Sequence, residues 1–215
     1  MKKTAYLLSV LIFAACANWD SVHYPPGADV PNEDLVPVES IKGDGITSFD
    51  RNHLVDDSVF ADPNYISESQ VQAFLEETPY GTRSFLADYS LNDLSASEII
   101  TETGVEHDIN PLILLVKLQV ETGLVSKTEI PTDHLLNRAM GCACPDNGTC
   151  SILDSGFEEQ LDCAADLMRR YLEEQEETGS TWTGWAVGSS RQTLDDVTVT
   201  PVNMATAALY TYTPW

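Results

Sequence analysis

The segment from Asn110 to Gly123 constrains the fold of this chain more than any other part of the sequence. Asn110 is a preferred N-cap residue, Pro111 suits the first helical position, and Gly123 suits a left-handed residue after the last turn. Almost every side chain between them is apolar, and a helix that is apolar on all its faces has to be buried. The segment therefore predicts a helix at the centre of a helical domain.

The last turn of this expected helix carries an acidic residue, Glu121, at the end where the helix dipole disfavours a negative charge. Burial favours the protonated form of a carboxyl group, and a general acid needs a proton to give near neutral pH. Most glutamates in a last helical turn are solvated and have no catalytic role. Glu121 is thus a candidate general acid, with an ordinary surface glutamate as the alternative.

The first fifteen residues have the pattern of an export signal. Two lysines precede a short apolar run, and Phe13-Ala14-Ala15-Cys16 resembles a bacterial lipobox. In such lipoproteins the cysteine becomes the acylated N-terminal residue, so we expect residues 1–15 to be removed and Cys16 to carry the lipid anchor. Ala17 follows the cysteine in place of Asp, which by resemblance to such lipoproteins favours the outer membrane, facing the periplasm, if the cell has one. Ordinary signal-peptidase cleavage is the alternative, because Phe is unusual at the first lipobox position.

The other four cysteines form an even set, which in an exported protein indicates disulfides. They are Cys142, Cys144, Cys150 and Cys163. A zinc site is the competing interpretation, but their spacing does not form paired CxxC knuckles. Three pairings are possible, and Cys142 and Cys144 are too close to pair without strain. Of the other two we prefer Cys144–Cys150 with Cys142–Cys163.

The charge of the chain excludes one class of partner. With 34 acidic and 11 basic residues, the chain lacks the basic face that nucleic-acid binding needs. Solubility is the simplest explanation of the acidic surface. The four histidines show no metal-binding spacing, so we expect no metal and no cofactor. We also expect a monomer. The histidines are His23, His53, His107 and His134.

Composition divides the remainder of the chain into a tether and a domain. Residues 16–62 contain several prolines, many acidic residues and no sustained apolar period, which predicts a tether with little stable structure. Residues 63–215 are expected to form one mainly α domain of the α+β class. Its β element is expected to be a hairpin of Trp185–Val187 with Val197–Val199, joined by a turn at Gly188.

Start signals predict several helices besides the central one. Capping boxes begin at Ser67 and at Ser95, where a Ser is followed three residues later by Gln or Glu. The segment Ser155–Glu158 is expected to open a long amphipathic helix. Thr200-Pro201 is expected to cap the last helix.

Beyond these local signals, residues 65–215 resemble a family of exported bacterial proteins with a lysozyme-like fold, within the lytic transglycosylase and goose-type lysozyme superfamily. In that superfamily an Asn-Pro or Asp-Pro opens a buried helix that ends in Glu-Ser or Glu-Thr. Glu121-Thr122 fits this pattern of the superfamily, but it departs from the narrower exported family, whose members often have Glu-Gln. The chain also lacks the Tyr-Asn-Ala-Gly block of classical lytic transglycosylases. The pieces that carry the resemblance are Ser69–Leu75, Asn110–Leu124, Pro131–Asp133, Arg138–Gly141, Cys144–Asp146 with Cys150, and Pro201–Pro214.

The resemblance implies roles for particular residues. Glu121 matches the glutamate that protonates the glycosidic oxygen, and Met140 and Gly141 match a segment that lines the glycan cleft. A glycine at this place lets a sugar approach the backbone closely. A plain turn beside the disulfides is the alternative. The wall formed by residues 133–150 is expected to face a second wall formed by the last helix.

On that last helix Asn203, Tyr210 and Tyr212 are candidate substrate-binding residues. Tyr210 and Tyr212 are two residues apart, so at most one of them should face the cleft. Asn203 has the alternative role of capping the helix. A glycosidase usually needs a second carboxylate, for which we prefer Asp133 over Glu129 because Asp133 matches the family. Enzymes of the superfamily with a single Glu, assisted by the N-acetyl group of the substrate, give the alternative.

Together these features predict a lipid-anchored glycosidase or lytic transglycosylase of the cell envelope that cleaves the β-1,4 bond of an N-acetylated glycan, with peptidoglycan as its partner. The missing Tyr-Asn-Ala-Gly block leaves the type of product open. A non-catalytic glycan-binding protein, or a structural envelope lipoprotein with the same fold, is the alternative.

Overall fold

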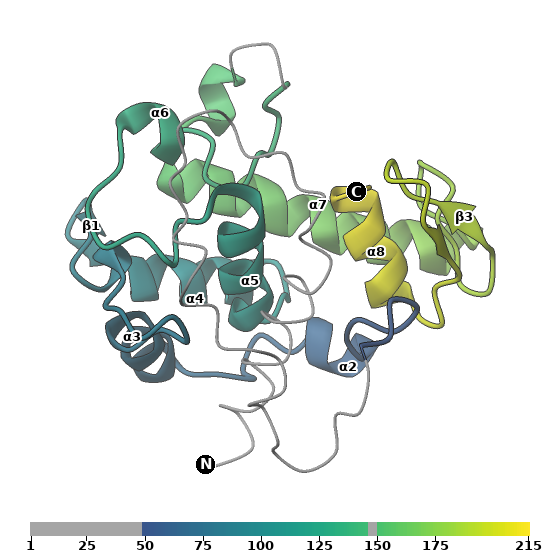
Figure 1. Ribbon diagram of the computed structural model, residues 1–215, viewed down its shortest axis with the longest axis horizontal. Coiled ribbons are helices and arrows are strands. Elements are labelled where there is room, and N and C mark those ends of the chain that lie inside the picture. The colour runs from purple at the N-terminus through teal and green to yellow at the C-terminus, as the bar shows by residue number, and fades with distance from the viewer. Residues whose placement is uncertain (1–48, 146–149) are drawn as a thin grey trace. The chain divides into compact units, whose positions relative to one another are not determined.

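The computed structural model describes residues 49–145 and 150–215 (Figure 1). The expected signal peptide, the lipidation site at Cys16 and most of the expected tether lie outside the described residues. Arg51 to Trp215 form one compact unit. This unit is mostly helical with small antiparallel β elements, which confirms the predicted class. No helix of the described residues is both long enough and apolar enough to cross a bilayer.

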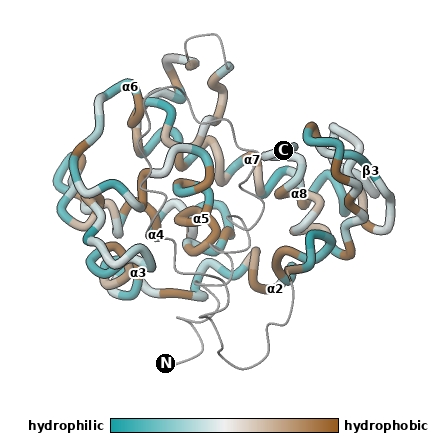
Figure 2. Tube along the Cα trace, viewed as in Figure 1, coloured by the Kyte–Doolittle hydropathy of each residue, from teal (hydrophilic) through white to brown (hydrophobic). Residues whose placement is uncertain are grey.

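The predicted central helix is present as α5 (Pro111–Thr122). The Asn110 side chain accepts a hydrogen bond from the Leu112 N–H at 2.9 Å, and Gly123 has the left-handed φ of 67°. Every residue from Pro111 to Gln119 is buried, and Figure 2 shows the largely apolar character of this helix. Both ends and the burial of α5 are therefore as predicted.

Two helices with the predicted capping boxes precede it, α3 (Glu68–Glu76) and α4 (Ala96–Glu106). Between them lie a 3-10 turn, η3 (Phe85–Ala87), and a hairpin of β1 (Ser90–Leu91) with β2 (Leu94–Ser95). The hairpin was not predicted. Its turn residues Asn92 and Asp93 both have positive φ, which the type I′ turn of a two-residue hairpin requires and which Asn and Asp tolerate.

The longest helix is α7 (Phe157–Thr178), which contacts both α4 and α8 (Met204–Tyr212) (Figure 1). It begins after Gly156, not with a cap by Ser155; Gly156 has a φ of 137° and no side chain to accept a hydrogen bond. Leu161, Ala164 and Met168 are fully buried on its apolar side.

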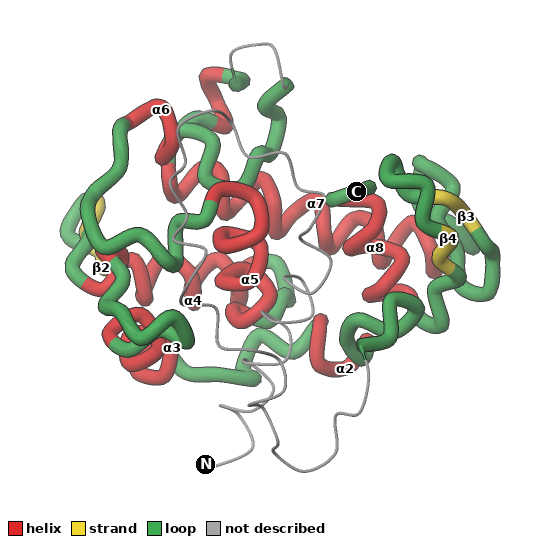
Figure 3. Tube along the Cα trace, in the orientation of Figure 1, coloured by secondary structure: helices red, strands yellow, loops and turns green. Residues whose placement is uncertain are grey.

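Figure 3 shows long loops between α5 and α7 that contain α6 (Asp133–Leu136) and η4 (Ile152–Asp154). Two disulfides brace this connection. They join Cys142 to Cys163 and Cys144 to Cys150, which confirms the preferred pairing.

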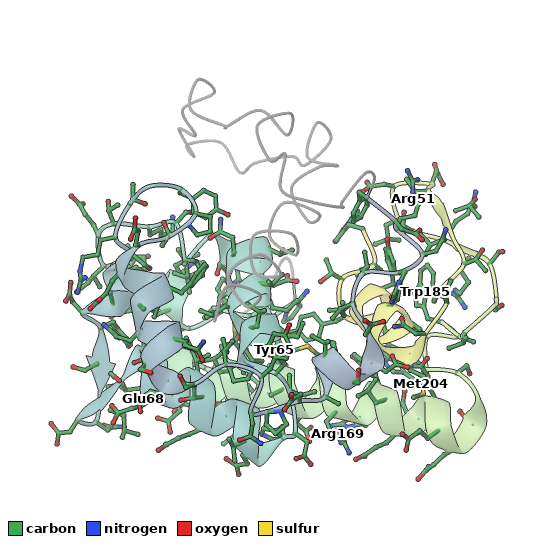
Figure 4. The ribbon with its side chains drawn as sticks, turned by 90° about the horizontal axis from the view of Figure 1, so that it is seen from below. Arg51, Tyr65, Glu68, Arg169, Trp185 and Met204 are labelled. Atoms are coloured by element: carbon green, nitrogen blue, oxygen red, sulfur yellow. A yellow bond between two sulfur atoms is a disulfide. The ribbon has the colours of Figure 1, made fainter. Side chains whose placement is uncertain are left out.

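The second hairpin pairs β3 (Arg191–Gln192) with β4 (Thr198–Val199). Its second strand is close to the prediction, but the first is not Trp185–Val187, and Gly188 is not in the hairpin turn. The Trp185 ring instead stacks on Tyr210 of α8, with ring centroids 5.1 Å apart. Figure 4 shows Trp185 beside this helix. The apolar pattern around Trp185 is therefore explained by packing against α8 and not by a strand at this position.

The last helix, α8, begins after Asn203, whose side chain accepts a hydrogen bond from the Thr206 N–H at 3.1 Å. The expected cap at Thr200-Pro201 is wrong by three residues, because Asn203 fills the cap position with a better acceptor.

The domain also begins earlier than predicted, at Arg51 and not at residue 63. The additional segment contains α2 (Asp57–Phe60), with Val55 and Phe60 buried. The Asp57 carboxylate accepts a hydrogen bond from the Ala205 N–H at 2.7 Å. Isolated apolar residues among acidic ones show no period in the sequence, so only the contacts with α8 reveal that this segment is folded.

Candidate active site

Glu121 lies at the end of α5 with one carboxylate oxygen held by two donors. Oε1 accepts a hydrogen bond from the Lys117 ammonium at 2.5 Å and one from the Thr213 hydroxyl at 2.6 Å. Lys117 also contacts Thr213 directly. The Glu121 side chain is 21% exposed and that of Lys117 only 4%. The last turn of α5 is thus fastened to the residue that follows α8.

Lys117 occupies an unusual position for a charged side chain, inside the apolar helix. Burial lowers the pKa of its ammonium, and the attraction of Glu121 acts in the opposite direction. The Lys117 nitrogen also lies 4.3 Å from the centroid of the Tyr212 ring, a cation–π contact. The ammonium is therefore compensated by one carboxylate, one hydroxyl and one aromatic ring.

Tyr212 extends this cluster to the loop before the disulfides. Its hydroxyl donates to the Met140 carbonyl at 2.8 Å. Burial raises the pKa of the Tyr212 hydroxyl, and the negative charge of Glu121 adds to the effect. The hydroxyl is thus a fixed, neutral donor at neutral pH.

The other oxygen of Glu121, Oε2, faces Gly141. A Cβ atom at Gly141 would lie 3.5 Å from Oε2, and Gly141 is exposed with a φ of 68°. Thr122, next to Glu121, donates to the Ala139 carbonyl at 2.8 Å and so holds the same loop against the helix end. Within the part of the chain that the structure describes, Oε2 makes no hydrogen bond. It is the chemically free oxygen of the cluster.

The other expected substrate-binding residues have different surroundings. The Met140 side chain is fully buried and belongs to the core, while its backbone carbonyl accepts the hydrogen bond from Tyr212. Asn203 uses its oxygen as the cap of α8 and its nitrogen to donate to the Val55 carbonyl at 2.6 Å. Tyr210 stacks on Trp185. Tyr212 contacts the Glu121 cluster, through the cation–π contact with Lys117 and the hydrogen bond to the Met140 carbonyl.

Asp133 is not joined to Glu121 by any contact among the described residues. It is the exposed first residue of α6, and its charge acts on the Tyr89 hydroxyl, whose pKa is raised mainly by burial. The Tyr89 ring packs against Phe157 on α7, 5.3 Å between centroids. Glu129 is also exposed. Asp133 therefore has no described partner in the Glu121 cluster, and its role as second carboxylate stays a prediction.

Two members of the cluster were missed by the sequence analysis, Lys117 and Thr213. Lys117 had a signal, because a lysine four residues before a glutamate on a helix is placed to pair with it. Thr213 had none, since 92 residues separate it from Glu121 and only the packing of α8 brings them together.

No known family model matches the chain, and neither does a curated protein or a solved structure. The resemblance to lysozyme-like proteins therefore stays a prediction.

Proposed function

We propose that the chain is a glycosidase that cleaves the β-1,4 bond of an N-acetylated cell-wall glycan, peptidoglycan first of all, with Glu121 as the general acid. The observation that carries this proposal is the unequal setting of the two Glu121 oxygens. Oε1 is held by Lys117 and Thr213, while Oε2 lies beside the exposed backbone of Gly141. A sugar ring can approach a glycine backbone closely, and a fixed carboxyl group with one free oxygen suits proton donation to it.

Lys117 and Thr213 both hold Oε1, and so they fix the orientation of the Glu121 side chain. Oε2 is then the oxygen from which a proton would pass to the glycosidic oxygen, and Gly141 lies beside it.

The surroundings of Glu121 favour a mechanism with a single carboxylate. Within the described residues, Glu121 is the carboxylate that acts on both Lys117 and Tyr212. Glu121 protonates the glycosidic oxygen as the bond from that oxygen to C1 breaks, and the acetamido carbonyl oxygen of the substrate bonds to C1. The Glu121 carboxylate then takes a proton from the nucleophile that opens this ring. Water gives a reducing sugar, and a hydroxyl of the sugar itself gives an anhydro product.

The test is the release of soluble fragments from purified peptidoglycan by the whole chain, followed by mass spectrometry. We expect wild type to release fragments and Glu121→Gln to be slower by at least about 100-fold, the usual worth of a general acid. Glu129→Gln, an exposed carboxylate eight residues further on, is the matched control and should keep wild-type activity. Asp133→Asn should also stay active if one carboxylate is enough.

The fragment masses separate the two outcomes of the reaction, because a hydrolysed and an anhydro product differ by one water. Circular dichroism of Glu121→Gln has to match wild type, so that a loss of activity is not a loss of fold. Absence of release by folded, oxidised wild type would refute the proposal.

A second candidate, a non-catalytic glycan-binding protein, is favoured by one observation. Lys117 is almost completely buried and pairs with Glu121, which is also what a purely structural ion pair looks like. In this case the chain would sediment with insoluble peptidoglycan without releasing fragments, and Glu121→Gln would sediment equally.

We also propose that the chain works in the cell envelope, anchored by a lipid on Cys16. The two disulfides support an oxidising compartment. Cys16→Ala should move the protein from the membrane fraction to the soluble fraction. An unchanged membrane fraction would refute the lipid anchor.

A further inference from the structure

A second group of metal-ligating side chains lies where the end of α4 meets α7. Glu106, His107 and Asp162 each offer one ligand atom, and these three atoms all lie within 4.8 Å of one another. The His107 Nε2 atom is 2.6 Å from Asp162 Oδ1. We propose that these three residues bind a zinc ion that links α4 to α7. This site is independent of the proposed reaction at Glu121.

The kind of ligand selects the metal. Mg²⁺ and Ca²⁺ take oxygen ligands, while an imidazole nitrogen with carboxylates suits Zn²⁺. Bonds of about 2.0 to 2.1 Å in a tetrahedral site put neighbouring ligand atoms about 3.4 Å apart. His107 Nε2 and Asp162 Oδ1 lie 2.6 Å apart, so they have to move apart by about 0.8 Å to reach this spacing. Glu106 and Asp162 are exposed and can move. Three protein ligands leave the fourth position for water.

The electrostatic setting favours a cation. The three residues line a shallow depression that also contains Asp154, and Asp166 with its ion-pair partner Arg170. Four carboxylates and one guanidinium thus surround the depression. His107 is also the C-cap residue of α4, and the end of a helix dipole attracts positive charge.

The site has a structural consequence, because Asp162 directly precedes Cys163. The disulfide from Cys163 to Cys142 fastens α7 to the loop that lies beside Glu121. A zinc ion bound by Asp162 would fasten α7 to the end of α4 at the residue before this disulfide. The turn that leads from α4 into α5 follows His107 immediately, so metal binding would stabilise the start of the central helix.

The experiment is isothermal titration of the whole chain with zinc chloride after removal of metals by a chelator. We expect one zinc ion per chain and a higher thermal midpoint in its presence. His107→Ala and Asp162→Asn should each weaken binding by at least about tenfold, since even the loss of a group that only hydrogen-bonds to a metal ligand has this effect. Asp162→Asn keeps the shape of the side chain, so its effect is not one of unfolding.

A matched control lies elsewhere in the domain. His53 pairs with Asp56 at 2.9 Å, a histidine–carboxylate pair outside this three-residue group. His53→Ala should leave zinc binding unchanged, and magnesium chloride should not compete. Absence of binding to wild type, unchanged binding in His107→Ala, or equal loss in His53→Ala would each overturn the proposal.

Discussion

The pairing of Lys117 with Glu121 can be broken without leaving a cavity. Methionine has nearly the same length and volume as the lysine stem, so Lys117→Met removes the ammonium and keeps the packing inside α5. What remains is a carboxylate that has lost its counter-charge and one of its two donors. The substitution therefore isolates the electrostatic part of the interaction.

The size of the effect follows from the geometry. Two unit charges 2.5 Å apart attract by about 7 kcal/mol at an effective dielectric constant of about 20. Desolvation of the two ions offsets most of this, but removal of one partner of a buried pair costs about 3 to 5 kcal/mol. Because the Glu121 side chain is 21% exposed, water relieves part of the penalty. We expect Lys117→Met to lower the free energy of unfolding by about 3 kcal/mol, the low end of that range.

Urea unfolding at pH 7 with the disulfides intact, followed by circular dichroism, measures this loss. A double-mutant cycle completes it. Lys117→Met with Glu121→Gln removes both charges, so it should cost at least about 1.5 kcal/mol less than the sum of the single substitutions. The matched control is Arg169→Met, which breaks a pair of the same i, i+4 spacing with Glu173 on the surface of α7. Its effect should stay within about 0.5 kcal/mol.

Additive single substitutions would refute the assignment of Lys117 and Glu121 as a coupled buried pair. A loss in Arg169→Met as large as that in Lys117→Met would refute it too, because burial would then make no difference to the cost.

Two further predictions concern the ends of the domain. Tyr212 has a raised pKa, so the folded state keeps its proton above about pH 10 while the unfolded chain loses it. Wild type should therefore lose stability as the pH rises above about 10, and Tyr212→Phe should lose less, measured as urea midpoints along a pH series. Phe60 is fully buried, so Phe60→Ala should cost about 3 to 5 kcal/mol by urea unfolding, while Val202→Ala, at an exposed position, should cost little. An equal effect of the two substitutions would contradict the revised domain boundary.

The sequence predicted best those features that neighbouring residues determine by themselves. Both capping boxes and both ends of α5 were predicted because the side chain that caps a helix lies within three residues of the group it satisfies. The disulfide pairing was also predicted, since the short spacing left few choices. Periodicity in the apolar residues gave α7 in the same way.

The features that were missed depend on contacts between distant segments. The segment Trp185–Val187 is apolar because Trp185 packs on α8. Alternation of apolar residues cannot distinguish such packing from a strand. The sequence nominated Glu121, Gly141 and Tyr212 of the cluster around Glu121. The members that it missed are a lysine that the apolar pattern obscured and a threonine 92 residues away. The two carboxylates expected to work together also receive separate surroundings, because α6 begins at Asp133 and turns it to solvent.

The hydrogen bonds between the first residues of the domain and the region of α8 also limit when the domain can form. The Leu54 N–H donates to the Thr206 side chain across 152 residues, and the Val202 N–H donates to the Asn52 carbonyl. Asp57 caps α8 from across 148 residues. A chain that emerges from a ribosome or a translocation channel one end at a time has to wait with α2 unpaired until α8 has followed.

Closing so long a loop is slow compared with forming helices from neighbouring residues. The central helices can form and pack first, while Phe60 and the start of α8 are still accessible to chaperones and proteases. Completion of the fold is then a late event, because it requires α8 to be present.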